Sequence, residues 1–474
     1  MSPVLPILVP LVTALVCFLL RGHRLASRLA SVAGAGLLLA AAVVLLLQAM
    51  DQGIVVARMG NWPPPFGIVL VADHLSVAMV LIAGVSGLAV AVYAWTDIDP
   101  RRERSGYHGF FHVLLAGICG AFLTGDIFNL YVWFEVMLIA SFALITLGGD
   151  KAQMDGAVRY VALNLIATLL FLIAIAMLYG MTGTLNMAEL HGALQGVGNQ
   201  GLVTAVAMLF MVAFGIKAAL FPLYFWLPAS YHTPPIAVSA IFAALLTKVG
   251  VYALIRVFTL IFTTDVGYTH TVLLWVAGLT MVMGVLGAAA QTDVRRILSF
   301  HIISQIGYMV LGLALFTPLA LAGAVFYLIH HIIVKANLFL IAGVMHRLAG
   351  SFALSRLGGL YRDRPWLAAL FLVPALSLAG LPPLSGFWAK FLIVGASLEA
   401  GHAVAAGVAL AVGLLTIYSM TKIWVQAFWK PLPAAAGPTV PLSRGRLAFL
   451  VVPVTGMALL TVIIGLWPQP FVTY

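Results

Sequence analysis

Apolar runs separated by short polar segments make up almost the whole chain. About fourteen of these runs reach the roughly 20 residues that an α-helix needs to cross a bilayer. They begin near Val4, Leu29, Leu75, Phe110, Ile127, Val158, Leu202, Ile236, Thr271, Ile297, Ala320, Trp366, Ala403 and Leu447. Inside a bilayer every backbone polar group must be hydrogen-bonded within the protein, which an α-helix achieves. The pattern therefore predicts an all-α polytopic membrane protein with about 14 transmembrane helices.

The basic residues between the runs test this count, because a missed helix would exchange the two sides of the membrane for every later loop. When the loops are assigned alternately, one side receives Arg21, Arg24, Arg28, Arg101, Arg102, Arg104, Lys151, Arg159, Arg295, Arg296, Arg347, Arg356, Arg362, Arg364, Lys430, Arg444 and Arg446. The other side receives only Arg58. Since cytoplasmic loops carry the excess of Lys and Arg, we expect a multi-pass protein of the inner (plasma) membrane with both termini outside.

Composition excludes a soluble globular protein. The 474 residues are 63% hydrophobic and 8% charged, and the mean hydropathy is +1.12, which is typical of polytopic membrane proteins. The net charge of +10 does not indicate a nucleic-acid partner, because the basic residues lie in short loops. The longest loops, about 51–73 and 179–201, are too short to fold alone. We therefore expect no cofactor and no metal site in this chain, and any redox or nucleotide site would lie on a partner.

Five charged residues lie inside the apolar runs. They are Glu135, Lys217, Lys248, Lys335 and Lys390. A charge within a membrane-spanning helix costs several kcal/mol, so such residues usually face a bundle interior or a water-filled cavity and lie on ion paths. A single buried lysine is often a snorkelling residue or the static partner of another protein chain. Four lysines and a glutamate favour a proton or cation pathway instead.

Proline-rich breaks lie close to two of these lysines. The segments are GIKAALFPLYFWLPASYHTPP, which contains Lys217, and LAGLPPLSGFWAKF, which contains Lys390. Proline interrupts a helix, and in a membrane this is tolerated where the backbone is buried in protein or lines a watered cavity. Breaks five spans apart suggest two five-helix repeats of inverted topology. The expected divisions are 1–109 for helices 1–3, 110–262 for the first repeat, 271–428 for the second repeat, and 429–474 for the C-terminal loop and helix 14.

Several long motifs resemble one known family. They are GDIFNLYVWFEVMLIASFALI, FGIKAALFPLYFWLPASYHTPPIAVSAIFAALLTKVGVYALIR, QTDVRRILSFHIISQIGYM, FYLIHHIIVKANLFLIAG and GLPPLSGFWAKFLI. Together they resemble the proton-translocating antiporter-like family, which contains the large membrane-arm subunits of respiratory complex I and the A-type and D-type subunits of Mrp sodium/proton antiporters. Total length, the N-terminal SPVLPILVPLVTAL and the HHIIVKANLFL segment are most similar to the D-type Mrp subunit, since the A-type subunit is much longer.

This resemblance implies a role for each buried residue. Glu135 and Lys217 match an ion-paired couple in which the carboxylate keeps the lysine charged. Lys248 matches the central lysine of a proton relay. His331 and Lys335 match the residues that bridge to its far end, and Lys390 matches the terminal proton-exchanging group. A related complex I subunit has glutamate at that last position, so lysine here favours the D-type Mrp subunit.

Other polar residues leave alternatives open. His331 and Lys335 are four positions apart and share one helix face. His330 points about 100° away from His331, so at most one of the two histidines faces the relay, and His330 is favoured as a core residue. His301 is either an entry-site group or a polar residue at a helix end. Asp126, at the outer edge of its span, is either a cation-entry group or a merely solvated loop carboxylate. Hydroxyls that suit proton transfer are those of Ser239, Thr247 and Ser304.

Three functions are compatible with these features. The first is a non-enzymatic, proton-conducting subunit of a multi-subunit sodium/proton antiporter, with other antiporter subunits and membrane lipids as partners. The second is an antiporter-like subunit of complex I or of a related membrane hydrogenase. The third is a scaffold with a vestigial channel, which the five buried charges disfavour. Because the sequence has no carboxylate cluster of the kind that a sodium site needs, we expect the cation path to lie wholly or partly in partner subunits.

Overall fold

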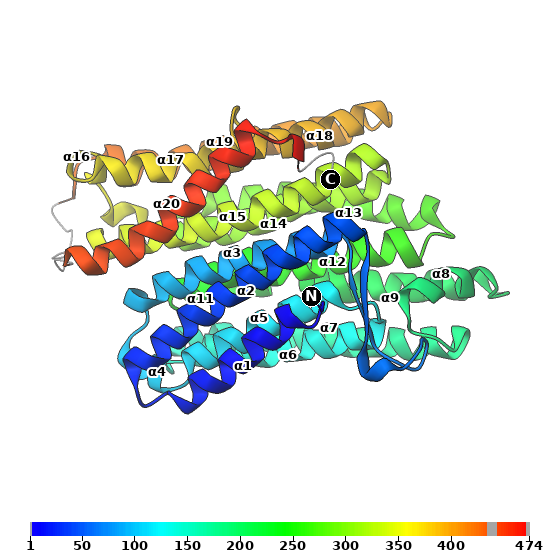
Figure 1. The fold of residues 1–474 in the computed structure, drawn as a ribbon. Helices are drawn as coiled ribbons and strands as arrows, with labels where there is room; N and C mark the ends of the chain where they lie inside the picture. The colour runs from blue at the N-terminus through cyan, green and yellow to red at the C-terminus, as the bar shows by residue number, and fades with distance from the viewer. Residues whose placement is uncertain (1, 434–442, 471–474) are drawn as a thin grey trace. The chain divides into compact units, whose positions relative to one another are not determined.

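A computed structural model describes residues 2–433 and 443–470 of the chain, and almost all of its regular structure is helical (Figure 1). The α-helices are α1 (Leu5–Leu19), α2 (Arg24–Gln52), α3 (His74–Asp97), α4 (Pro100–Arg104), α5 (Tyr107–Leu123), α6 (Ile127–Thr146), α7 (Lys151–Thr182), α8 (Met187–Gln195), α9 (Gln200–Ala218), α10 (Trp226–Ser230), α11 (Ile236–Ile241), α12 (Thr247–Arg256), α13 (Val266–Ala290), α14 (Val294–Leu315), α15 (Pro318–Ala349), α16 (Leu360–Asp363), α17 (Pro365–Ala379), α18 (Ser385–Glu399), α19 (Ala403–Trp424) and α20 (Arg444–Leu466). The other elements are the strands β1 (Val55–Arg58) and β2 (Val69–Ala72), the 3-10 helices η1 (Met59–Asn61) and η4 (Leu354–Arg356), and the π-helices η2 (Phe242–Leu246), η3 (Val257–Ile261) and η5 (Val425–Trp429). Residues 434–442 of the predicted C-terminal loop lie outside the described residues.

Membrane-spanning helices account for most of this structure. Within the described residues, 11 helical segments are long and apolar enough to cross a membrane, and the shorter apolar helices are Leu5–Leu19, Tyr107–Leu123 and Pro365–Ala379. The predicted all-α polytopic fold is therefore confirmed. The count of about 14 spans and the inverted repeats stay predictions.

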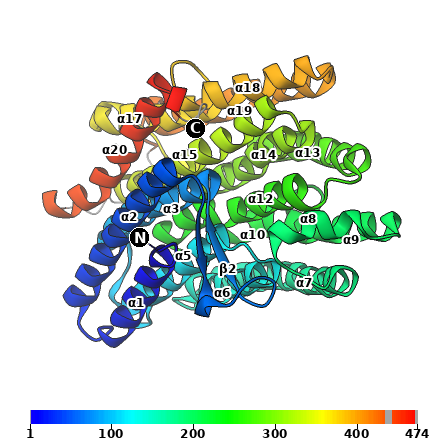
Figure 2. The same cartoon turned by 45° about the vertical axis from the view of Figure 1, so that its right-hand side comes forward.

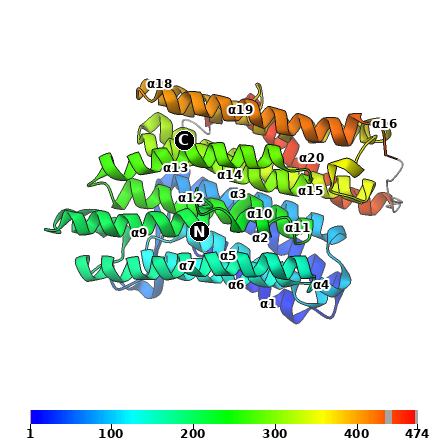
Figure 3. The same ribbon diagram turned by 180° about the vertical axis from the view of Figure 1, so that it is seen from behind.

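The chain forms two compact units. The first comprises Met1–Ala91, Asp99–Ala219 and Leu245–Val272. In this unit α5, α6, α7 and α9 pack in succession, and α1 and α2 cover α5 (Figures 1 and 3). β1 and β2 form an antiparallel hairpin, with Val55 opposite Ala72, where the sequence predicted only a loop (Figure 2). The amide of Gly125 donates to the carbonyl of Val69, which joins the hairpin to the segment before α6.

The second unit comprises Val92–Ile98, Leu220–Ala244 and Leu273–Tyr474. Its central element is α15, which packs against α11, α14, α17, α18 and α20 (Figure 1). The membrane-spanning windows of α14 and α15 are each 94% buried within the protein. Polar side chains on these two helices therefore face protein neighbours rather than lipid.

Both predicted helix breaks are present. Helix α9 ends at Ala218 and is followed by seven residues outside any helix, 219–225, before α10 begins. Helix α17 ends at Ala379, and α18 begins at Ser385. Ala219 has a φ of +61°, a left-handed conformation that ends α9 directly after its lysine. The sequence prediction of an interruption next to Lys217 and next to Lys390 is confirmed.

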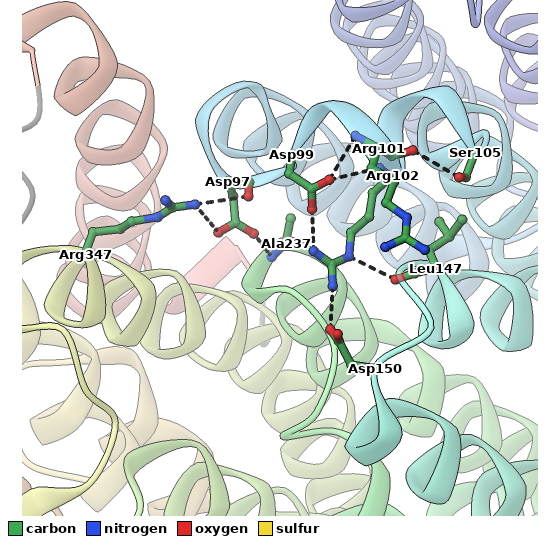
Figure 4. A network of polar contacts seen from close by, with 9 residues as sticks. All are labelled: Asp97, Asp99, Arg101, Arg102, Ser105, Leu147, Asp150, Ala237 and Arg347. Atoms are coloured by element: carbon green, nitrogen blue, oxygen red, sulfur yellow. Dashed lines mark hydrogen bonds and ion pairs between the residues drawn. The ribbon is translucent and has the colours of Figure 1, made fainter.

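Loop ion pairs in the first unit hold neighbouring helix ends (Figure 4). The guanidinium of Arg102 donates to the carboxylates of Asp99 and Asp150 and to the carbonyl of Leu147. Burial alone would raise the pKa of Asp99, but the hydrogen bonds and the charge of Arg102 outweigh it, and the pKa lies below its usual value. These contacts connect the start of α4 to the segment between α6 and α7.

In the second unit Asp97, the last residue of α3, has a corresponding role (Figure 4). Its Oδ2 accepts a hydrogen bond of 2.9 Å from the amide of Ala237, in the first turn of α11. Arg347, near the end of α15, donates to the Asp97 carbonyl at 3.1 Å and lies 3.6 Å from Oδ1. The carboxylate of Asp97 accepts from an amide that has no partner within α11, and it also pairs with Arg347. Asp97 thus connects the end of α3 to the start of α11 and to the end of α15.

Candidate functional site

The predicted relay residues fall into two groups, one in each unit. Glu135, Lys217 and Lys248 belong to the first unit, and His331, Lys335 and Lys390 belong to the second. The side chains of Lys248, His331 and Lys335 are fully buried, and Lys217 is 8% exposed. Lys390 and Glu135 are half-buried. Each unit therefore holds at least one ionisable side chain fully away from water.

Lys217 lies in the last turn of α9, directly before the break. Its Nζ lies over the ring of Phe134, 5.5 Å from the ring centroid. Glu135, the next residue of α6, acts on Lys217 electrostatically, but no ion pair joins the two side chains in this structure. Glu135 Oε1 is buried and has no hydrogen-bond partner. The resemblance implies an ion pair between Glu135 and Lys217, and in this structure the two side chains are separated.

Lys248 lies on α12, two residues after the π-helix η2. Gly250, one half-turn further on, packs directly on the backbone of α9, since a Cβ at this position would lie 2.7 Å from the Ala218 amide nitrogen. The helix that carries Lys248 thus contacts the end of the helix that carries Lys217. The hydroxyl of Thr247 is buried here and has no hydrogen-bond partner. Single π-helical turns of this kind are common at functional sites.

In the second unit, α15 carries both predicted bridging residues. Lys335 Nζ donates a hydrogen bond of 3.1 Å to the carbonyl of Leu298 on α14. The neighbouring His330 has its Nδ1 2.7 Å from the hydroxyl of Ser385, at the start of α18. That hydroxyl lies 3.1 Å from the hydroxyl of Ser377, on the other side of the break. The sequence favoured His330 as a core residue, and the structure places it against the second helix break.

Lys390 lies on α18 and points back to the break. Its Nζ donates a hydrogen bond of 2.9 Å to the carbonyl of Ala379, the last residue of α17. It also lies over the ring of Tyr308, 4.9 Å from the centroid. The hydroxyl of Tyr308 donates to the carbonyl of Ala409 on α19. A free carbonyl at a helix C-terminus and the face of an aromatic ring both favour a cation, so these two contacts offset part of the cost of burying the ammonium.

Aromatic and amide side chains around these lysines were not predicted from the sequence. Tyr308 stacks on Tyr327 at 5.3 Å between ring centroids, and the hydroxyl of Tyr327 donates to Gln305. Gln305 and Tyr308 are three residues apart, which places them on one face of α14. This spacing within SQIGYM was the available signal, but an amide and a ring inside an apolar run are equally compatible with ordinary helix packing.

The sequence left the roles of His301 and Asp126 open, and the structure shows which groups each side chain contacts. His301 Nε2 is hydrogen-bonded to the hydroxyl of Ser419, and the charges of Lys335 and Lys390 act on the imidazole. Asp126 caps the N-terminus of α6, with Oδ1 accepting from the Asn129 amide at 2.7 Å, and burial raises its pKa. Among the residues that the structure describes, no three His, Cys, Asp or Glu side chains come together as a metal-binding group would.

Known proteins are similar to this chain in sequence and in fold over almost its whole length. Residues 124–416 match the family described as NADH:quinone oxidoreductase/Mrp antiporter, TM. The chain is 47% identical to the D-type subunit of the Na(+)/H(+) antiporter of Alkalihalophilus pseudofirmus, with 99% of this chain and 95% of the relative aligned.

Two solved structures extend the comparison. The structure of the Mrp complex from Dietzia sp. DQ12-45-1b contains a chain with 34% identity and a TM-score of 0.92, over 99% of this chain and 95% of that one. A chain of respiratory complex I from Thermus thermophilus with bound NADH has 25% identity and a TM-score of 0.85, over 100% of this chain and 99% of that one. The chain belongs to the NADH:quinone oxidoreductase/Mrp antiporter transmembrane family.

Proposed function

We propose that this chain is the proton-translocating subunit of a multi-subunit sodium/proton antiporter of the Mrp type. The relative with 47% identity is named as the D-type subunit of such an antiporter, and the structural neighbour with 34% identity belongs to an Mrp complex. The complex I chain, with 25% identity, is a more distant match. A component of a secondary transporter is therefore favoured over a component of a redox enzyme.

The observation that carries the proposal is the position of Lys217. It is buried beside a helix break, with Glu135 on one neighbouring helix and α12, which carries Lys248, packed against its backbone. A carboxylate near a buried lysine stabilises the ammonium, and burial without the carboxylate favours the neutral amine. Movement of Glu135 toward or away from Lys217 therefore loads or releases a proton.

The remaining relay residues continue this path within their own units. Lys248 receives the proton in the first unit, and His331, Lys335 and Lys390 carry it in the second, with Lys390 exchanging it with one side of the membrane. The buried hydroxyls of Thr247 and Ser304 have no protein hydrogen-bond partner. Buried polar groups are almost always satisfied, and internal water is the partner that also conducts protons.

The membrane arrangement belongs to the same proposal. Segments 110–262 and 271–428 form two inverted five-helix repeats, helices 1–3 precede them and helix 14 follows. The basic loops face the cytoplasm and both termini lie outside, in the inner (plasma) membrane. A break next to a buried lysine in each repeat supports this division.

Alanine substitution of the couple tests the proposed function. Lys217→Ala and Glu135→Ala should each abolish sodium-dependent proton exchange in everted vesicles from cells that produce the complete complex. Breaking a buried charge pair can cost about 3 to 5 kcal/mol, so assembly of every variant is checked by co-purification of the other subunits. Wild-type exchange in fully assembled Lys217→Ala vesicles would refute the relay. Co-purifying iron–sulfur subunits would favour a complex I-type assembly instead.

A further inference from the structure

An aromatic ring lies under the lysine at each helix break. In the first unit Lys217 Nζ lies 5.5 Å from the centroid of Phe134, and in the second unit Lys390 Nζ lies 4.9 Å from the centroid of Tyr308. An ammonium within about 6 Å of a ring centroid is attracted by the negative face of the ring. Phe134 lies on α6 and Tyr308 on α14, the second helix of each proposed repeat, so the two contacts occupy corresponding places beside the two breaks.

In the first unit the ammonium of Lys217 has two possible partners that are neighbours in the sequence, the ring of Phe134 and the carboxylate of Glu135. Phe134 and Glu135 are consecutive residues of α6, so they point about 100° apart on the helix. Phe134 is 3% exposed and is held by stacking on Phe214, at 5.9 Å between centroids. A fixed ring and a nearby carboxylate with a buried, unpartnered oxygen offer Lys217 two alternative positions.

In the second unit the ring is fixed by its hydroxyl. Tyr308 is fully buried and donates to the carbonyl of Ala409, which sets the plane of the ring below Lys390. The ammonium has the carbonyl of Ala379 as its hydrogen-bond acceptor. The titratable groups around it are Tyr308 itself and His301 on α14, and His330 on α15. Lys335 acts electrostatically on the same two histidines. None of these is a carboxylate, so the attraction of the ring has no anionic competitor among these groups.

We propose that Phe134 and Tyr308 are positioning residues that hold the protonated side chains of Lys217 and Lys390 between transfer steps. This inference rests on the proposed relay. A ring attracts the ammonium and not the neutral amine, so it favours the loaded form of each lysine. Because a ring has no net charge, it holds the ammonium more weakly than a carboxylate does, and the lysine can leave it when Glu135 approaches.

Fluorination of Phe134 tests the proposal without a change of shape. Mono-, di- and trifluorinated phenylalanine progressively weaken the negative face of the ring. Since the loaded lysine loses stabilisation, the alkaline limb of the pH profile of exchange should move stepwise to lower pH, by about 0.5 to 1 pH unit in total. Exchange is measured in everted vesicles that carry the complete complex.

Phe210 provides the matched control for this series. It is a buried ring of the same aromatic cluster, 5.7 Å from Phe214 between centroids. Lys217 lies over the ring of Phe134, not over that of Phe210. Its fluorinated variants should keep the alkaline limb of the wild type. An unmoved limb in the Phe134 series, or an equal shift in the Phe210 series, would overturn the proposal.

In the second unit, two substitutions of Tyr308 distinguish the contribution of its ring from that of its hydroxyl. Tyr308→Phe keeps the ring and loses the bond to Ala409, whereas Tyr308→Leu loses both. The leucine variant should shift the alkaline limb to lower pH, and the phenylalanine variant should leave it in place. Equal shifts in both variants would assign the effect to the hydroxyl and refute a ring contact. If Lys217→Ala abolishes exchange while every ring variant keeps the wild-type limb, the relay stands and only this inference fails.

Discussion

At the scale of single residues, the second-unit lysines differ in their surroundings. Lys335 is fully buried and donates to a carbonyl inside α14, whereas Lys390 is half-buried and donates to the carbonyl at the end of α17. A carbonyl at a helix end has no partner within its own helix. It therefore accepts a proton donor of any kind, ammonium or carboxylic acid, which makes Lys390 the position where a change of chemical group is most informative.

Replacement of Lys390 by glutamate or arginine distinguishes a proton carrier from a fixed charge. Glutamate can load and release a proton, and its protonated form can donate to the carbonyl of Ala379. Lys390→Glu should retain partial exchange with a shifted pH profile. Arginine stays protonated at any accessible pH, so Lys390→Arg should be inactive. Everted-vesicle exchange across a pH series is the measurement, and equal activity of Lys390→Arg and wild type would limit Lys390 to an electrostatic role.

Sequence reasoning located the buried charges but not their neighbours. A lysine in an apolar run is costly and therefore conspicuous. Phe134 and Tyr308 carry no such signal, because an aromatic residue in a membrane-spanning run is equally expected against lipid, in a helix interface or under a cation. Their role depends on a contact between different helices, and only the fold specifies that contact.

At the scale of elements, glycines permit the close packing at both breaks. A Cβ at Gly250 would lie 2.7 Å from the Ala218 nitrogen, and a Cβ at Gly386 would lie 1.8 Å from the Ser377 carbonyl oxygen. Both distances are shorter than any normal contact of a Cβ atom. Both neighbours are backbone atoms, which cannot move away by a change of side-chain rotamer. Each helix break is therefore held by a neighbouring backbone at a position where no other residue fits.

Gly250→Ala should separate α12 from the end of α9 and impair exchange. Overpacking of a close contact typically costs about 1 to 3 kcal/mol, and the displacement would act on the helix that carries Lys248. We expect at least about a tenfold loss of exchange in assembled complexes, since displacements of about 1 Å can cost 100-fold. Gly180→Ala in α7 is the matched control, because a Cβ there meets nothing within 4 Å. Equal exchange in the two variants would show that this contact does not position the relay.

The helix breaks could be predicted, but other local features could not. Prolines beside Lys217 and Lys390 mark the interruptions directly. The π-helix η2 lies within the continuous apolar segment IFAALL, so its extra residue per turn leaves no trace in the pattern. The hairpin of β1 and β2 was predicted as a loop, because two strands of four residues contain too few positions for an alternating pattern to stand out.

At the scale of the whole molecule, composition and the uneven charge of the loops were sufficient to predict that the chain is a polytopic membrane protein. The spans follow from hydrophobic length, and the family follows from motifs that cover residues 124–416. Composition contains no information about partner subunits, because interfaces with lipid and with membrane partners are similarly apolar. The assignment to a multi-subunit complex therefore depends on the relatives and not on any surface of this chain.

The chain produced alone should insert in the membrane but show no sodium/proton exchange. A sodium site needs several oxygen ligands at short range, and the sequence has 14 Asp and Glu in 474 residues, with Glu135 placed beside Lys217 rather than in a carboxylate cluster. We therefore expect the cation path to lie wholly or partly in partner subunits. The measurement compares liposomes that contain the purified single chain with liposomes that contain the complete complex, at equal protein density. Sodium-dependent proton movement in the single-chain liposomes at the rate of the complete complex would show that this chain contains the cation path as well, and would remove the need for a partner in transport.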